Sequence, residues 1–133
     1  MMDAVIAAGE RLAEALRAEN EALAALDLTR AAAMATRKMQ ATDAFAAAAA
    51  AATRTQARAE GPLRAAAESM AADLSSLGQE NRKLLEAAIA LQSRVIETIA
   101  GAARPLANGP GYGKAGRSRP PVQAAAMALA TQA

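Results

Sequence analysis

The sequence contains no cysteine, histidine or tryptophan, and its only aromatic residues are one phenylalanine and one tyrosine. Without cysteine the chain has no disulfide bonds and no thiolate nucleophile, and without cysteine or histidine it lacks the usual ligands of zinc. The glycine-rich stretch GPGYGKAGRS does not have the spacing of a phosphate-binding loop, and no strand is expected beside it. We therefore expect no enzymatic activity, no catalytic residues, no cofactor and no metal site.

Charge and hydropathy argue against two further classes. The end of the chain carries Lys114, Arg117 and Arg119 and no acidic residue, but three charges without interleaved aromatic side chains are a weak nucleic-acid signature. The longest uncharged apolar run, AFAAAAAAA, is too short and too weakly hydrophobic to span a bilayer. The start of the sequence lacks the basic region and the long apolar core of a signal peptide. We expect a soluble, cytoplasmic protein that binds no nucleic acid and does not insert into membranes.

Alanine dominates the first part of the chain. Residues 3–60 contain no proline and a single glycine, Gly9. Large apolar residues recur there on one narrow helical stripe, which Glu19 interrupts. The pattern predicts one long amphipathic helix over about 3–60. A break near residues 27–29 stays open, because Asp27 is suited to cap a new helix.

Gly61 and Pro62 form the strongest break in the helical region. Glycine commonly ends a helix, and proline suits the first turn of the next one. A second helix is predicted over about 62–104, because apolar residues alternate there at steps of three and four, as in a coiled coil. A short turn makes the two helices antiparallel, which places Phe45 near Leu77.

The expected fold is all-α: a long antiparallel, coiled-coil-like two-helix hairpin over residues 1–104. Glycine, proline, asparagine and serine then crowd residues 105–121, which predicts a flexible linker. Residues 122–133 are predicted to form a short helical segment, which alone is too short to be stable in water. Two points stay open: whether this segment folds onto the hairpin, and whether the chain is a monomer or a weak homo-oligomer.

The apolar surface of the second helix widens toward its C-terminal end. The large aliphatic residues from Leu84 onward spread over roughly 160° of the helix circumference. The alanine-rich first helix is too small to cover such a surface. Two interpretations are open: a third helix or a second copy completes the core, or the surface is a groove for an amphipathic partner helix. The residues of this surface are Leu84, Leu85, Ile89, Leu91, Val95, Ile96 and Ile99.

Four segments of the sequence together resemble the FlgN family of flagellar type III export chaperones. They are AAGERLAEALRAENEALAALDL near the start, ENRKLLEAAIALQSRVIETIA in the second helix, YGKAGR, and the terminal PPVQAAAMALATQA. The order and spacing of the four segments carry the resemblance, which covers most of the chain. No fragment is diagnostic alone, since alanine-rich coiled coils resemble one another.

The resemblance implies a cytoplasmic chaperone without enzymatic activity. It would bind the C-terminal helical region of the hook-associated proteins FlgK and FlgL, prevent their premature assembly and deliver them to the export gate. The family holds cargo with the C-terminal part of its long hairpin, which here corresponds to the wide apolar surface. A tyrosine in the family's flexible segment docks on the gate protein FlhA, and Tyr112 is the only matching residue. The preference between FlgK and FlgL stays open.

An alternative function is that of a phasin-like or other structural protein, an amphipathic helical hairpin that coats a hydrophobic granule. Such a protein would also have a wide apolar face and few aromatic residues. A surface coat, however, needs apolar faces along both helices. The narrow, interrupted stripe over residues 3–60 therefore favours the chaperone.

Overall fold

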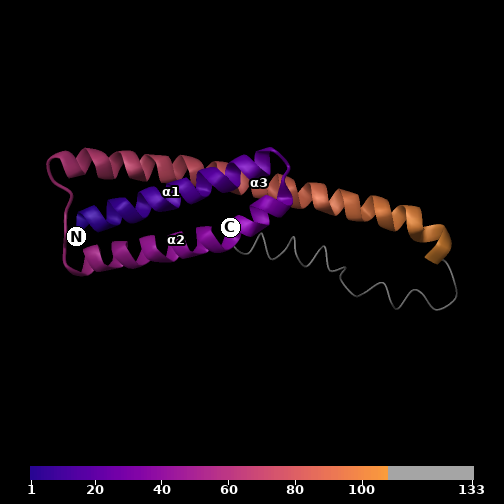
Figure 1. The fold of residues 1–133 in the computed structure, drawn as a ribbon, viewed down its shortest axis with the longest axis horizontal. Coiled ribbons are helices and arrows are strands. Elements are labelled where there is room, and N and C mark those ends of the chain that lie inside the picture. Colours follow the sequence, from indigo (N-terminus) through magenta and orange to yellow (C-terminus); the bar gives the residue numbers. More distant parts are fainter. Residues whose placement is uncertain (108–133) are drawn as a thin grey trace. The chain divides into compact units, whose positions relative to one another are not determined.

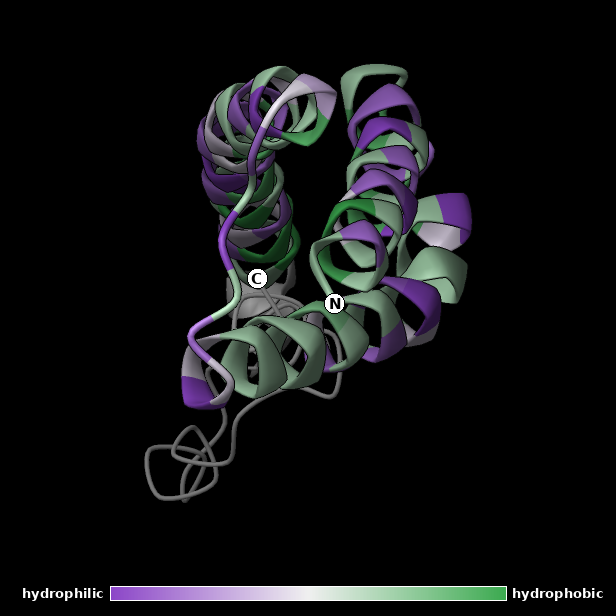
Figure 2. Ribbon diagram, turned by 90° about the vertical axis from the view of Figure 1, so that its left-hand side faces the viewer, coloured by the Kyte–Doolittle hydropathy of each residue, from purple (hydrophilic) through white to green (hydrophobic). Residues whose placement is uncertain are grey.

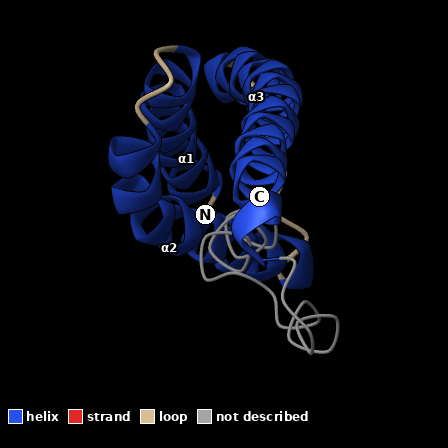
Figure 3. Cartoon of the chain, turned by 90° about the vertical axis from the view of Figure 1, so that its right-hand side faces the viewer, coloured by secondary structure: helices blue, strands red, loops and turns tan. Residues whose placement is uncertain are grey.

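Helices account for nearly all of the chain that the structure describes. The structure is a computed structural model that describes residues 1–107, with the side chains of residues 1–102. It contains α1 (Met2–Ala24), α2 (Leu28–Arg54) and α3 (Pro62–Ala107) (Figure 1). No strand occurs in residues 1–107 (Figure 3), so the predicted all-α class is confirmed. The linker predicted at 105–121 begins inside α3, and everything after residue 107 lies outside the described residues.

The chain divides into two units, Met1–Leu84 and a second unit that begins at Leu85. The boundary lies inside α3, and therefore inside the single hairpin unit expected over residues 1–104. Met1–Leu84 contains α1, α2 and the first half of α3. Within this unit the three helices surround a shared centre and do not lie in one layer (Figure 2).

The expectation of a single helix over residues 3–60 is wrong, because the chain reverses direction between α1 and α2. The break that stayed open near residues 27–29 is present, and Asp27 caps α2. Leu26 has a left-handed backbone with φ 58°. The N–H group of Leu26 donates to the carbonyl of Leu23 at 3.0 Å, and that of Asp27 donates to the carbonyl of Ala22 at 2.9 Å. These two hydrogen bonds form the Schellman motif that commonly closes the C-terminus of a helix. The sequence concealed this motif because its left-handed residue is leucine, where glycine is usual.

Two residues of this turn have opposite effects on its stability. The left-handed conformation of Leu26 costs about 1–2 kcal/mol. Its side chain is 63% exposed, so burial offsets little of that strain. Asp27 stabilises the start of α2, because its carboxylate accepts a hydrogen bond from the N–H of Arg30 at 3.1 Å. Such a cap contributes about 1 kcal/mol, so the turn carries little net stability of its own.

α2 ends at Arg54, earlier than the sequence predicts. The cause is a second residue with a left-handed backbone, Gln56, with φ 54°, which is followed by the same pair of cap hydrogen bonds. The chain then passes through Gly61, with φ 57°, a conformation that glycine adopts without strain. α3 begins at Pro62, so the predicted start of this helix is confirmed.

α1 and α2 pack against each other as an antiparallel hairpin (Figure 1). A long helical hairpin is thus present as expected, although both of its arms come from the segment predicted as one helix. Twelve of the 23 residues of α1 are buried, against four of the 27 residues of α2. α1 is therefore the central helix of Met1–Leu84, in contact with both α2 and the first half of α3.

A hydrophobic core cluster joins the three helices of this unit, and Phe45 packs against it. Lys38 of α2 reaches Asn81 of α3, with 3.4 Å between Nζ and Oδ1. The expected pairing of Phe45 with Leu77 would place Lys38 opposite Leu84, so the observed register is displaced by about one helical turn. The displacement follows from the earlier end of α2, which moves the point where the chain reverses. The buried members of the cluster are Val5, Ile6, Ala52 and Met70.

Gly9 lets α1 and α3 approach each other closely. A Cβ atom built on Gly9 would overlap the sulfur of Met70 and lie 2.8 Å from its Cγ. A Cβ atom on Gly78 or Gly101, both in α3, would meet no heavy atom within 4 Å. The glycine of α1 therefore has a packing role that these two glycines of α3 do not share.

Candidate functional site

The surface predicted to bind a partner helix lies on α3 from Leu84 onward. Its members do not share one environment. Val95 and Ile99 are 49% and 62% exposed, whereas Leu85 is 3% exposed. The half-buried members are Leu84, Ile89, Leu91 and Ile96.

Exposure of this surface rises along the helix. Leu85 and Ala88, near its start, are buried, and Val95 and Ile99, one turn apart, are open to solvent. Leu85 is therefore not accessible to a partner in this structure. Single exposed apolar residues are ordinary on protein surfaces, but two neighbours bordered by half-buried aliphatic residues form a continuous strip. We call the strip from Ile89 to Ile99 the α3 apolar strip; it consists of Ile89, Leu91, Val95, Ile96 and Ile99.

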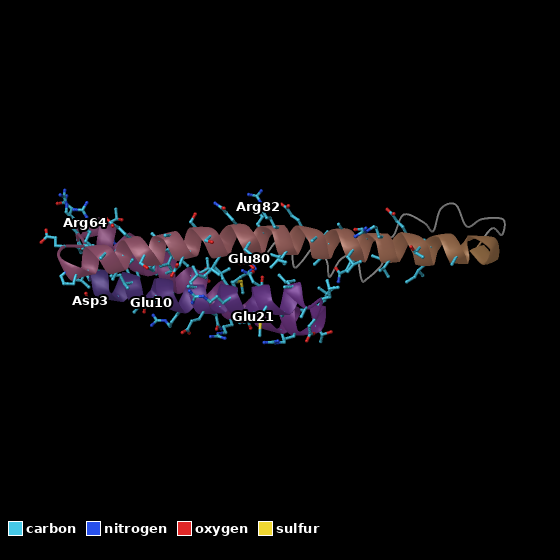
Figure 4. All side chains as sticks on the ribbon, turned by 90° about the horizontal axis from the view of Figure 1, so that it is seen from above. Asp3, Glu10, Glu21, Arg64, Glu80 and Arg82 are labelled. Carbon is cyan, nitrogen blue, oxygen red and sulfur yellow. The ribbon has the colours of Figure 1, made fainter. Side chains whose placement is uncertain are left out.

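Charged residues of α3 occupy the side away from this strip. Arg94 and Glu97 are exposed, and helical spacing places both on the opposite side of α3 from Ile99. Arg82, shortly before the strip, projects outward from α3 (Figure 4). α3 is thus amphipathic around the strip. Its apolar side is unusual for an amphipathic helix because part of that side is exposed to water.

Gln92 lies within the strip, where the sequence reasoning did not consider it. Helical spacing from Leu85 and Ile96 places it between the aliphatic residues, which is the signal that would have revealed it. Its Oε1 atom is buried and has no hydrogen-bond partner among the described residues. An unpaired buried acceptor costs about 1–3 kcal/mol. The strip therefore combines apolar side chains with one acceptor that a donor from a partner or from water would satisfy.

A second candidate is a cluster of four buried polar side chains inside Met1–Leu84. Lys38 Nζ donates to Glu19 Oε1 at 3.0 Å and to Asn81 Oδ1 at 3.4 Å. Asn81 Nδ2 donates to the same Glu19 oxygen at 2.7 Å and to Asn20 Oδ1 at 2.9 Å. Asn20 Nδ2 in turn donates to the carbonyl of Leu77 at 3.3 Å. All four side chains belong to residues no more than 4% exposed.

This polar cluster is suited to holding the three helices in register. Glu19 and Asn20 come from α1, Lys38 from α2 and Asn81 from α3, so the hydrogen bonds connect every pair of helices. A buried ion pair adds little net stability, but a slip that separated its members would leave a charge buried and unpaired. Because the groups satisfy one another and are closed to solvent, they are not available to a substrate. A partial signal of this cluster is present in the sequence, since Glu19 interrupts the apolar stripe of the first segment and Asn81 falls among the apolar positions of the second helix.

The surface of Met1–Leu84 has several open hollows. One of these hollows, of about 300 Å³, is lined by side chains of α1 and α3. Arg17 and Asp73 meet there at 3.7 Å, but both side chains are about half exposed, and such ion pairs contribute little. Within residues 1–107 no group of acidic side chains is placed to hold a metal ion. No helix in that part of the chain has both the length and the hydropathy to cross a bilayer.

Two predicted features fall outside the described residues: Tyr112, the candidate docking residue, and the terminal segment 122–133. Comparison of the chain with protein-family models, with curated proteins and with solved structures finds no match. The functional argument therefore rests on the α3 apolar strip and on the sequence resemblance.

Proposed function

We propose that the chain is an export chaperone of the FlgN type. It binds the C-terminal helical region of the hook-associated proteins FlgK and FlgL in the cytoplasm, prevents their premature assembly and delivers them to the export gate. The observation that supports the proposal most directly is the exposure of Val95 and Ile99 on one side of α3. Aliphatic side chains at helical spacing are what an amphipathic partner helix needs on the surface that receives it.

The proposed mechanism is capture of a helix by burial of apolar surface. Each large aliphatic side chain that passes from water into the interface contributes about 1.5–3 kcal/mol. Loss of translational and rotational freedom and ordering of side chains offset part of this gain. The strip therefore supports moderate, reversible binding, which suits a carrier that must release its cargo. While bound, the cargo helix has its own apolar side covered and cannot assemble.

Charge substitutions in the strip test this proposal. Ile99→Asp and Val95→Asp place a carboxylate where the cargo helix packs, and each substitution lowers cargo affinity at least about tenfold, because an unpaired charge is strongly disfavoured in an interface. The measurement is calorimetric titration with the C-terminal helical region of FlgK or FlgL. Ala90→Asp is the matched control, since Ala90 is exposed on the opposite side of α3. Circular dichroism verifies that all three variants remain helical.

Two results would contradict the proposal. If the strip variants bind cargo as tightly as the control, cargo does not use this surface. If FlgK and FlgL that retain their C-terminal helical regions do not bind the unmodified chain, the chaperone function itself is wrong.

The alternative, a coat for hydrophobic granules, makes a different demand on the surface. It needs large exposed apolar residues along α1 and α2, but among the described residues of these two helices only Met39 is one; Met1 and Leu26 lie before α1 and in the turn. Co-sedimentation with polyester granules separates the two functions. A coat protein sediments with the granules, and Ile99→Asp alone does not release it.

A further inference from the structure

The turn between α1 and α2 consists of residues that are able to continue the helix. Only Ala25, Leu26 and Asp27 separate α1 from α2. No glycine or proline occurs anywhere between Glu10 and Glu60, which is why this region reads as one helix in the sequence. Leu26 reaches its left-handed conformation only under strain, and its side chain is left 63% exposed. A short, strained hinge of this kind favours exchange of the connected elements between copies.

The contacts that hold α1 on α2 do not require both helices to belong to one chain. The Lys38–Glu19 ion pair, the Arg37–Glu14 pair and the buried apolar side of α1 would form equally well if a second copy supplied α1. Two interactions exist only when the turn is closed: the hydrogen bonds of the cap at Leu26 and the Asp27 cap of α2. Opening the turn breaks these cap hydrogen bonds and relieves the strain at Leu26. The same backbone groups then form the hydrogen bonds of a continuous helix.

We propose that α1 and α2 can join into one continuous helix, and that two copies of the chain then exchange their α1 helices to form a domain-swapped dimer. In this dimer α1 of each copy occupies the place of the other's α1, against α2 and the first half of α3. The polar cluster is rebuilt with Glu19 and Asn20 from one copy and Lys38 and Asn81 from the other. Because burial of an unpaired Glu19 is strongly disfavoured, the cluster permits only the exchange that restores every partner.

Two substitutions at the hinge shift the equilibrium between monomer and swapped dimer in opposite directions. Leu26→Gly removes the strain of the closed turn and weakens the open helix, so dimerisation becomes roughly 30-fold weaker or more, since two hinges open per dimer. Asp27→Ala removes the cap of α2 and favours the continuous helix, so dimerisation becomes roughly tenfold stronger or more. Sedimentation velocity of the full chain over a range of concentrations, after equilibration, measures both constants. Circular dichroism and thermal unfolding show that the variants are folded.

Gln56→Gly is the matched control for the hinge. Gln56 has nearly the same backbone conformation as Leu26 but lies in the longer connection between α2 and α3. Relieving its strain stabilises the chain without changing the ratio of monomer to dimer. An equal shift from Gln56→Gly and Leu26→Gly would overturn the assignment of the hinge.

Cross-linking identifies which helices are exchanged. Because the sequence contains no cysteine, each variant carries only the thiol that is introduced. Glu14→Cys and Arg37→Cys are introduced into separate chains, at exposed positions whose side chains lie 4.0 Å apart. The two chains are mixed in denaturant, refolded together at high concentration and treated with a short bis-maleimide. A swapped dimer gives a product that links one chain of each kind. A dimer without this product, or monomers in every variant at the highest soluble concentration, would overturn the proposal.

Discussion

Met1–Leu84 and the part of α3 after Leu84 distribute polar and apolar side chains in opposite ways. The first unit buries Glu19, Lys38 and Asn81 at the meeting point of its three helices, and the second exposes Val95 and Ile99. In the first unit, polar groups that satisfy one another restrict the helices to one arrangement. In the second, apolar side chains remain in water, and their burial would be favourable. The difference indicates that the polar side chains specify how the helices of Met1–Leu84 pack, whereas the α3 apolar strip leaves apolar surface in water.

The largest effect is expected where the buried ion pair is broken. Lys38→Ala leaves the Glu19 carboxylate buried without its cation and destabilises the chain by about 3–5 kcal/mol. Urea unfolding followed by circular dichroism measures this loss. Arg37→Ala is the control, because Arg37 meets Glu14 at 4.0 Å with both side chains more than half exposed, and its removal costs well under about 1 kcal/mol. Equal losses in the two variants would show that Lys38 is solvated in solution.

A smaller effect, of the opposite sign, is expected at Gln92, the polar residue within the apolar strip. Gln92→Leu removes the unpaired buried acceptor and stabilises the chain by about 1 kcal/mol. Thermal unfolding provides the comparison, with Gln79→Leu as the control because Gln79 is exposed on the same helix. A loss of stability in Gln92→Leu would mean that Oε1 has a hydrogen-bond partner in solution.

The smallest effect is expected at the exposed end of the strip. Ile99→Ala changes the free energy of unfolding by less than about 0.5 kcal/mol, because its side chain is 62% exposed. The same substitution at Ile6, which is 7% exposed, costs about 2–5 kcal/mol. Denaturant unfolding of the two variants side by side measures the contrast. If Ile99→Ala proves as costly as Ile6→Ala, the strip is covered in solution and the comparison between the two units fails.

The sequence predicted those boundaries of the fold that rest on glycine and proline. Pro62 marked the start of α3, and Gly61 adopts the left-handed conformation for which glycine is suited. The end of α2 was missed, and the break before α2 stayed only an open alternative near residues 27–29, because Leu26 and Gln56 occupy the positions where glycine is usual. Packing of the helices on either side, and not the local preference of these two exposed residues, determines where the turns lie, so the local sequence does not indicate them.

The candidate site was predictable only in part, for a similar reason. Helical periodicity identified the apolar side of α3, but it cannot show that Leu85 is buried while Ile99 is exposed. The polar cluster depends on Glu19, Lys38 and Asn81 meeting across three helices in a register that the unexpected turn at Leu26 creates. Glu19 and Asn81 alone read as interruptions of an apolar pattern, and no pattern singled out Lys38.

The close approach of α1 and α3 at Gly9 has a consequence for oxidative damage. Since the chain has six methionines and no cysteine, an oxidant finds thioethers as its sulfur targets. Met1 and Met39, which are 58% and 44% exposed, react before the buried Met70, at places where an added oxygen meets water. The sulfur of Met70 lies directly against Gly9, where a sulfoxide oxygen has no room. Met1 and Met39 thus act as sacrificial sites, and damage to the packing of α1 on α3 begins only when oxidation reaches Met70.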